Sequence, residues 1–301
     1  MSRVFTGSIS HALSAGDTAA LDISGTELTM MGWIYWAPGE GTGPMFAKWT
    51  GSAKQYWIGV ATAQGRLNAK IGNGSSSEEV VQSTATIATN TWYHFCARKN
   101  GTGANALQGF INGSQDGSVT SNLSIGVTGN GVVFGQQSDF SSSDRLNGTV
   151  AHCAIWDVAL TDLEIFLLSR GITPYYIRPG NLRAWWPLFG TASVEPDWSQ
   201  YRSGASVVGS PAISSLMPRM GVIAPPRVYA PYTIVPGFLD SAEVYLNLEA
   251  SGSDIYEPGC FIIGDGEAVL RWNAGDQRLR WLGYDANLRW DAVMRLGSGQ
   301  C

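Results

Sequence analysis

The sequence predicts an all-β protein in which one large two-sheet sandwich or jelly roll precedes a small β module. Short runs of aromatic and β-branched residues alternate with turn residues roughly every ten positions, a spacing typical of sandwiches and jelly rolls. Only 14% of the residues are charged and 37 are glycine, as expected for short strands joined by tight turns. Twelve tryptophans supply apolar surface for a core, which argues against disorder.

The predicted strands follow one another along the first two thirds of the chain. Met1 to Phe5 leads directly into an opening strand. The step Asn112-Gly113 predicts a tight hairpin, because both residue types accept a positive φ. The remaining strands are predicted at residues 26–36, 55–61, 66–71, 91–98, 107–111, 132–135 and 148–156.

One helix is predicted, over residues 162–168. Thr161 can cap its N-terminus, and Glu164 three residues later completes a capping box. Gly171 stands where a helix stop is expected. We therefore expect a short acid-rich helix directly after the last strand of the sandwich.

The composition changes near residue 210, where six prolines punctuate residues 211–236. Proline at this density favours an extended connector. We predict a jelly-roll domain at residues 1–215, a connector at residues 216–240 and a small β module at residues 241–301.

The predicted module contains a repeat of the triad Leu-Arg-Trp with a spacing of nine residues. An uninterrupted helix or strand would turn successive triads to opposite faces. Turn residues lie in each interval, so three short strands in a meander are expected. The triads are Leu270-Arg271-Trp272, Leu279-Arg280-Trp281 and Leu288-Arg289-Trp290.

The ordered motifs of the first two thirds resemble the laminin G-like branch of the concanavalin A-type jelly rolls. That resemblance implies a concanavalin A-like (laminin G-like) two-sheet sandwich with a role in binding or scaffolding. The motifs that carry it are Phe5-Thr6-Gly7-Ser8, Leu28 to Ile34, Trp92-Tyr93-His94-Phe95, Phe110-Ile111-Asn112-Gly113, Leu146 to Val150, Trp156 to Ile165 and Asn181 to Leu188.

The resemblance also raises the question of calcium. Many relatives carry an acidic residue just after the Gly-Thr-Val step, but here Val150 is followed by Ala151. The nearest carboxylates, Asp139 and Asp144, lie in a Ser-rich loop whose oxygen atoms suit a hard cation. Asp and Ser also populate ordinary loops, so no cofactor is assigned and calcium is kept as an alternative.

We expect that the protein is not an enzyme. His94 lies inside an aromatic strand, where a core histidine with a hydrogen-bond partner is expected. Adjacent strand residues point to opposite faces, so His152 and Cys153 cannot form a catalytic dyad. Glu78 and Glu79 diverge for the same reason and cannot act as a glycosidase pair. The third functional hypothesis is an inactive relative of a glycoside hydrolase, or an active one whose carboxylates the sequence does not reveal.

Charge and cysteine content exclude several other classes. The net charge of −5 gives no electrostatic footprint for nucleic acid, and no apolar run reaches the length of a membrane span. The four cysteines form no CxxC pair, which argues against a zinc or thioredoxin-type site. Cys96 and Cys153 lie in apolar runs and are expected to be small buried side chains.

The leading functional hypothesis is a structural protein of a virus particle, either a bacteriophage capsid decoration (cement) protein or a tail-associated protein. No signal peptide precedes the first strand, and a virion protein made in the host cytoplasm leaves the cell by lysis. The jelly roll would face solvent, and the C-terminal part would attach to capsid proteins or to further copies of the chain.

The alternative hypothesis is a lectin-like glycan-binding module, free or on a phage head or tail. Trp185 and Trp186 must face opposite sides of an extended segment, so one of them is expected at a surface or interface. The Arg-Trp pairs of the repeat could stack on a partner. The candidate interface or glycan contacts are Trp185, Trp186, Arg271, Trp272, Arg280, Trp281, Arg289 and Trp290.

Overall fold

The structure is a computed structural model, and it divides the chain into two units, Met1–Pro225 and Pro226–Cys301. In the first unit it describes residues 2–218 except 9, 38–41, 62–64, 141–143 and 191–192. In the second it describes only the backbone of residues 260–262, 268–273, 278–283 and 291–295. Most of the predicted connector lies outside the described residues, and the predicted domain boundaries stay predictions.

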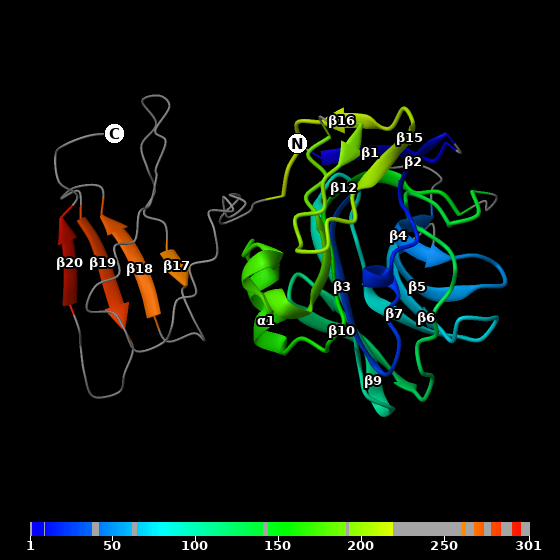
Figure 1. The fold of residues 1–301 in the computed structure, drawn as a ribbon, viewed down its shortest axis with the longest axis horizontal. Coiled ribbons are helices and arrows are strands. Elements are labelled where there is room, and N and C mark those ends of the chain that lie inside the picture. The colour runs from blue at the N-terminus through cyan, green and yellow to red at the C-terminus, as the bar shows by residue number, and fades with distance from the viewer. Residues whose placement is uncertain are drawn as a thin grey trace. The chain divides into compact units, whose positions relative to one another are not determined.

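The first unit is an antiparallel sandwich of two eight-stranded sheets, the predicted jelly roll (Figure 1). The first sheet has the order β10-β9-β8-β3-β12-β1-β16, and β13 also pairs with β12. Its strands are β1 (Ser2–Thr6), β3 (Glu27–Trp36), β8 (Trp92–Asn100), β9 (Gly103–Ile111), β10 (Ser114–Ser121), β12 (Asn147–Trp156), β13 (Leu182–Trp186) and β16 (Ala212–Ser214).

The second sheet has the order β14-β15-β2-β11-β4-β5-β6-β7. The apolar residues that the two sheets turn toward each other form one large core, which includes Phe46, Phe95 and Trp186. The strands of this sheet are β2 (His11–Ala15), β4 (Gly43–Trp49), β5 (Lys54–Val60), β6 (Arg66–Gly72), β7 (Glu78–Thr86), β11 (Val132–Phe134), β14 (Val194–Glu195) and β15 (Ala205–Gly209).

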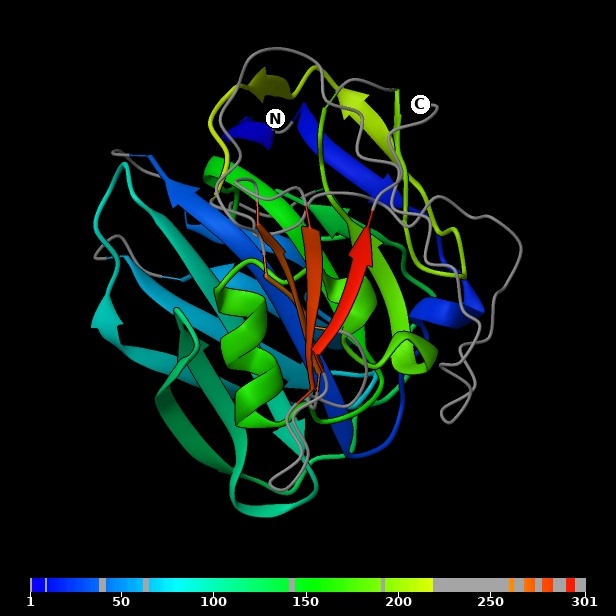
Figure 2. The same ribbon diagram turned by 90° about the vertical axis from the view of Figure 1, so that its left-hand side faces the viewer.

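Helix α1 (Asp162–Ser169) covers the outer side of the first sheet (Figure 2). Thr161 and Glu164 form the predicted capping box, and Gly171 has a φ of 91° just past the helix end. A second apolar cluster fills the space between sheet and helix. The described residues also form three short 3-10 helices, Ala19–Leu21, Pro174–Tyr176 and Pro179–Asn181. None of their helices has the length and hydrophobicity needed to cross a membrane.

Strand β12 changes partner along one edge, because β1 pairs with residues 147–150 and β13 with residues 153–156. The change coincides with a bulge at His152, which has a φ of 50° and donates its backbone N–H to the carbonyl of Pro187. Cys153 faces the core between the sheets. Cys96 and Cys153 are buried free thiols, as predicted, and burial raises the pKa of both.

The second unit contains an antiparallel meander of four strands, where three were predicted. Leu270 pairs with Trp281, Arg271 with Arg280, and Trp272 with Leu279, so two triads of the repeat lie side by side in antiparallel register. The third triad lies outside the described residues. The four strands are β17 (Cys260–Ile262), β18 (Ala268–Asn273), β19 (Arg278–Gly283) and β20 (Asp291–Arg295).

Candidate functional site

The outer face of the second sheet carries two tryptophans that do not belong to the core between the sheets. Trp57 alternates along β5 with the core residues Tyr56 and Ile58, so its side chain points to the opposite face. Trp49 and Trp57 form a separate small apolar cluster with Ala47. Indoles on the outer face of a sheet are shielded from water either by neighbouring side chains or by a bound ligand.

Two lysine side chains place their ammonium groups over these indoles. The Lys70 ammonium lies 4.8 Å from the centre of the Trp57 ring and 5.9 Å from that of Trp49, and the Lys54 ammonium lies 5.6 Å from Trp49. Both are within the range of cation–π attraction. Trp49 and Trp57 are only 3% and 1% exposed, so both indoles are buried in this structure.

The strand register explains why these side chains meet. Trp57 pairs directly with Lys70, and Asn68 stands two residues before Lys70 on the same side of β6. The residues between and beside them on β6, Leu67, Ala69 and Ile71, belong to the core. We call the outward set Trp49, Trp57, Lys54, Lys70 and Asn68 the Trp–Lys face.

Two polar atoms of the Trp–Lys face are buried without a hydrogen-bond partner: the indole Nε1 of Trp57 and Oδ1 of Asn68. Leaving a buried donor or acceptor unpaired costs about 1–3 kcal/mol. The two residues are diagonal neighbours on adjacent strands, at about 7–8 Å between their Cα atoms. The Trp–Lys face therefore combines two apolar indole rings with one unpaired hydrogen-bond donor and one unpaired acceptor.

The position of Trp49 is fixed by a loop that follows β11. Ser138 donates its backbone N–H to the carbonyl of Trp49 at 2.8 Å and accepts the N–H of Trp49 with its hydroxyl at 3.0 Å. The hydroxyl in turn donates to the carbonyl of Gly131 at 2.9 Å. Ser138 thus takes the place of a strand partner at the end of β4.

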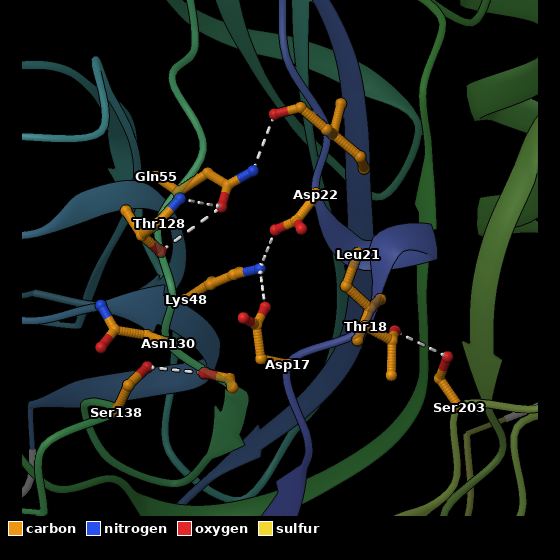
Figure 3. A network of polar contacts seen from close by, with 12 residues as sticks. Asp17, Thr18, Leu21, Asp22, Lys48, Gln55, Thr128, Asn130, Ser138 and Ser203 are labelled. Carbon is orange, nitrogen blue, oxygen red and sulfur yellow. Dashed lines mark hydrogen bonds and ion pairs between the residues drawn. The ribbon is translucent and has the colours of Figure 1, made fainter.

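Lys48, on the inner side of β4, forms two ion pairs with partly exposed carboxylates (Figure 3). Lys48 is fully buried, and its ammonium contacts the carboxylates of Asp17, at 2.8 Å, and Asp22. Nearby, Gln55 donates to the carbonyl of Ile23 at 2.7 Å. Because Lys48 points inward between Ala47 and Trp49, the network orients Trp49 outward.

The tryptophans predicted as contacts lie elsewhere. Trp185 and Trp186 face opposite sides, as predicted, with Trp186 between the sheets and Trp185 on the outer side of the first sheet. Both are 0% exposed. The expectation that one of them lies at a surface is therefore wrong, because Trp198 and His152 pack over Trp185. A glycan contact through either indole stays an untested prediction.

The other predicted contacts lie in the second unit, where only strand backbone is described. Arg271 and Trp272 fall in β18, and Arg280 and Trp281 fall in β19. Arg289 and Trp290 lie outside the described residues. Their role as contacts with a partner or a glycan stays a prediction.

The calcium alternative gains no support within the described part of the first unit. No group of three or more His, Cys, Asp or Glu side chains lies close enough there to hold a metal ion. Asp144 accepts a hydrogen bond from Gln137 at 3.1 Å. Residues 141–143 of the same loop lie outside the description.

The prediction for His94 is confirmed in its burial and wrong in its bonding. The ring is fully buried beside Trp33, with 5.3 Å between the ring centres. Neither ring nitrogen has a hydrogen-bond partner among the described residues. The predicted divergence of the two adjacent glutamates is confirmed, because Glu78 contacts Lys54 while Glu79 accepts from Ser121.

Sequence reasoning missed the Trp–Lys face, although part of its signal is present. The run Leu67-Asn68-Ala69-Lys70-Ile71 alternates strictly, which places Asn68 and Lys70 on the side away from the core. Nothing in the local pattern shows that Lys70 pairs with Trp57, because that depends on the register between two strands.

Comparisons with known proteins agree with this architecture. No curated protein sequence matches the chain. Among solved structures, a putative carbohydrate binding protein from Bacteroides ovatus is 15% identical with a TM-score of 0.51, and the match covers 69% of this chain and 58% of that one. The chain thus spans less than two thirds of that protein, and the likeness concerns the fold.

Two further structures are similar at lower scores. A heptameric SAP-like pentraxin from Limulus polyphemus is 21% identical with a TM-score of 0.39, over 54% of this chain and 83% of that one. Domain 4 of an extracellular arabinanase from Geobacillus stearothermophilus, solved with arabinotriose, is 19% identical with a TM-score of 0.43, over 56% and 76%.

The sequence comparison with protein families is more decisive. Residues 7–166, more than half of the chain, match the family described as the Concanavalin A-like lectin/glucanases superfamily. The matched region includes β3 to β12, and therefore the whole Trp–Lys face. The chain belongs to the concanavalin A-like lectin/glucanase superfamily.

Proposed function

We propose that this chain is a non-catalytic carbohydrate-binding protein whose sugar site is the Trp–Lys face. The observation that carries the proposal is the pairing of two outward indoles with the unpartnered Trp57 Nε1 and Asn68 Oδ1. A sugar ring offers an apolar C–H face for stacking on an indole, and hydroxyls that can accept from one group and donate to the other. Membership of a superfamily described by its lectins and glucanases supports the same ligand class.

Stacking of a sugar on Trp57 requires the Lys70 side chain to move. The group over the Trp57 ring is the Lys70 ammonium, at the end of a flexible four-carbon stem. Lys70, Val80 and Gln82 on β6 and β7 are partly or fully exposed, so the face is open on the β7 side. Rotation of Lys70 away from the ring makes room for a sugar.

The chemistry of the face supports binding without hydrolysis. Glycoside hydrolysis needs two carboxyl groups on either side of the scissile bond, about 5–9.5 Å apart. At the Trp–Lys face the neighbouring carboxylate is Glu78, which contacts the Lys54 ammonium at 2.8 Å. His94 and His152 are buried on the first sheet, away from this face.

A binding assay on an array of neutral and acidic oligosaccharides tests this function. Trp57→Phe keeps an apolar ring but removes Nε1, and Trp92→Phe is the matched control on the other sheet, since Trp92 is a partly exposed indole of β8. We expect at least a tenfold loss of affinity for Trp57→Phe and an unchanged affinity for Trp92→Phe. Equal behaviour of the two variants would place the site elsewhere, and a wild-type chain that binds no sugar would overturn the function.

We also propose that the module is carried on a virus particle, as a decoration or tail-associated protein of a bacteriophage. The support for this location is confined to the sequence: the proline-rich residues 216–240 and the Leu-Arg-Trp repeat in a module of about 60 residues. A unit of that size builds only a small core, so docking on a partner would stabilise it.

A further inference from the structure

We propose that the sugar bound at the Trp–Lys face is acidic and that Lys70 is the charge partner of its carboxylate or sulfate group. This inference rests on the proposed carbohydrate-binding function and adds the chemical class of the ligand.

Lys70 differs from the other lysines in what its ammonium contacts. Three ammonium groups have oxygen partners: Lys48 with Asp17 and Asp22, Lys54 with Glu78, and Lys99 with the carbonyl and hydroxyl of Ser121. The Lys70 ammonium contacts the two indole rings and has no carboxylate or hydrogen-bond acceptor within the described part of the chain.

An ammonium held only by aromatic faces keeps its three donors available. Cation–π attraction positions the group, and an ammonium has three N–H donors, so at least one of them can still bind an acceptor. Hydrogen bonds between an ammonium and a carboxylate or sulfate oxygen are about twice as strong as those between neutral groups. An anion is therefore the ligand group that Lys70 lacks.

The neighbours of Lys70 suit the rest of an acidic sugar. Trp57 Nε1 is a second donor next to Lys70, and Asn68 Oδ1 is an acceptor two residues along the same strand. The anion can take both donors while a ring hydroxyl donates to Asn68. A neutral sugar could also accept from the ammonium with a hydroxyl, but that bond is weaker than one to a carboxylate or sulfate oxygen, so the arrangement favours an acidic sugar.

The charges near Lys70 include one closed ion pair. Lys54 and Glu78 neutralise each other at the end of the face near Trp49. The chain as a whole carries a net charge of −5. Long-range attraction of polyanions to this protein is therefore unfavourable, and any preference for an acidic polymer has to come from direct contacts at the face.

The test compares matched polymers by isothermal titration with the full-length chain. Polygalacturonate against its methyl ester probes a carboxylate, and dextran sulfate against dextran probes a sulfate. Lys70→Met keeps an apolar stem over the indoles and removes the charge. Lys70→Arg restores the charge. Arg170→Met is the matched control, because it removes a cation that lies over the ring of Phe166 at the end of α1 and does not belong to the Trp–Lys face. Thermal melts verify that each variant is folded.

We expect the wild-type chain to prefer one acidic polymer over its neutral partner by tenfold or more, as a charge-assisted hydrogen bond allows. Lys70→Met should reduce that preference to about twofold or less, while Lys70→Arg and Arg170→Met retain it. Equal affinity for both members of each pair, or a preference that persists in Lys70→Met, would overturn this inference and leave carbohydrate binding intact. A chain that binds none of the four polymers and no sugar on the array would overturn both.

Discussion

Two histidines of the first sheet are buried in the folded protein without hydrogen-bond partners for their rings. His94 packs against Trp33, and His152 stacks on Trp185 at the bulge of β12. No partner among the described residues binds any of the four ring nitrogens. Burial lowers the pKa of both residues to about 3. Both rings are therefore neutral in the folded chain at any pH above about 4.

This burial predicts that the protein loses stability in mild acid. The unfolded chain protonates both histidines below a pH of about 6.5, whereas the folded chain does so only near pH 3. The unfolded state thus binds more protons between these values, and stability falls as pH falls through that window. Each histidine contributes up to about 1.4 kcal/mol per pH unit to the loss.

Urea unfolding between pH 7.5 and 4.5 measures this effect. His94→Phe keeps an aromatic ring beside Trp33, and His152→Asn suits the φ of 50° at the bulge. Each substitution should flatten the pH dependence of the free energy of unfolding, and the double variant should flatten it most. An unchanged slope in the double variant would show that acid sensitivity comes from other groups.

At the scale of elements, the turn between β9 and β10 packs closely against α1 at a single glycine. Asn112 and Gly113 have φ values of 51° and 84°, so the predicted hairpin turn is confirmed. A Cβ on Gly113 would lie 2.4 Å from the hydroxyl of Ser169 and 3.0 Å from the Cα of Phe166. Turn geometry and helix packing therefore demand glycine at the same position.

A pair of glycine substitutions separates these two demands. Gly101→Ala places a side chain at a φ of 68° with no atom within 4 Å, so it should cost only the strain of the left-handed conformation, about 1–2 kcal/mol. Gly113→Ala adds the collision with α1, which we expect to cost a further ~1–3 kcal/mol, a typical range for overpacking. Equal losses in urea unfolding would mean that α1 moves aside freely.

Local patterns predicted the elements whose signals are local. The capping box of α1, the Asn112-Gly113 turn and the aromatic strand β3 could all be recognised in short windows of sequence. The polar strand β10 was not predicted, because most of its residues are partly or fully exposed and lack a clear alternation. The hydrogen-bond partner expected for His94 is missing: the ring packs edge-on against Trp33, and neither nitrogen meets a polar group of the described residues.

The candidate site depends on information that no short window contains. Trp57 and Lys70 come from different strands and meet only through the register of β5 and β6. Sequence reasoning favoured Trp185 and Trp186, but both are buried. Trp185 is covered by His152 and Trp198, and Trp186 packs between the sheets against Phe46 and Phe134. Aromatic residues alone do not identify the candidate site. It is identified by the lysines that lie over the two outward indoles and by the unpartnered polar atoms beside them.

At the scale of the whole molecule, the two proposals assign separate tasks to the two units. The Trp–Lys face belongs to the unit Met1–Pro225, and the Leu-Arg-Trp repeat belongs to the unit Pro226–Cys301. If the second unit attaches the chain to a virus particle and the first binds sugar, then each activity should be removable without the other. Such independent loss would distinguish an anchored sugar-binding module from a capsid protein whose whole surface contacts other particle proteins.

Sedimentation of particles from a producing culture on a density gradient tests this division of tasks. We expect the full-length chain to co-sediment in fixed stoichiometry, and Lys70→Met to co-sediment equally well although it no longer prefers acidic sugars. A chain that ends at Pro225 should stay in the soluble fraction if residues beyond it provide the anchor. Recovery of the full-length chain only in the soluble fraction would overturn the virion location, and it would leave the sugar-binding proposal to stand on the Trp–Lys face alone.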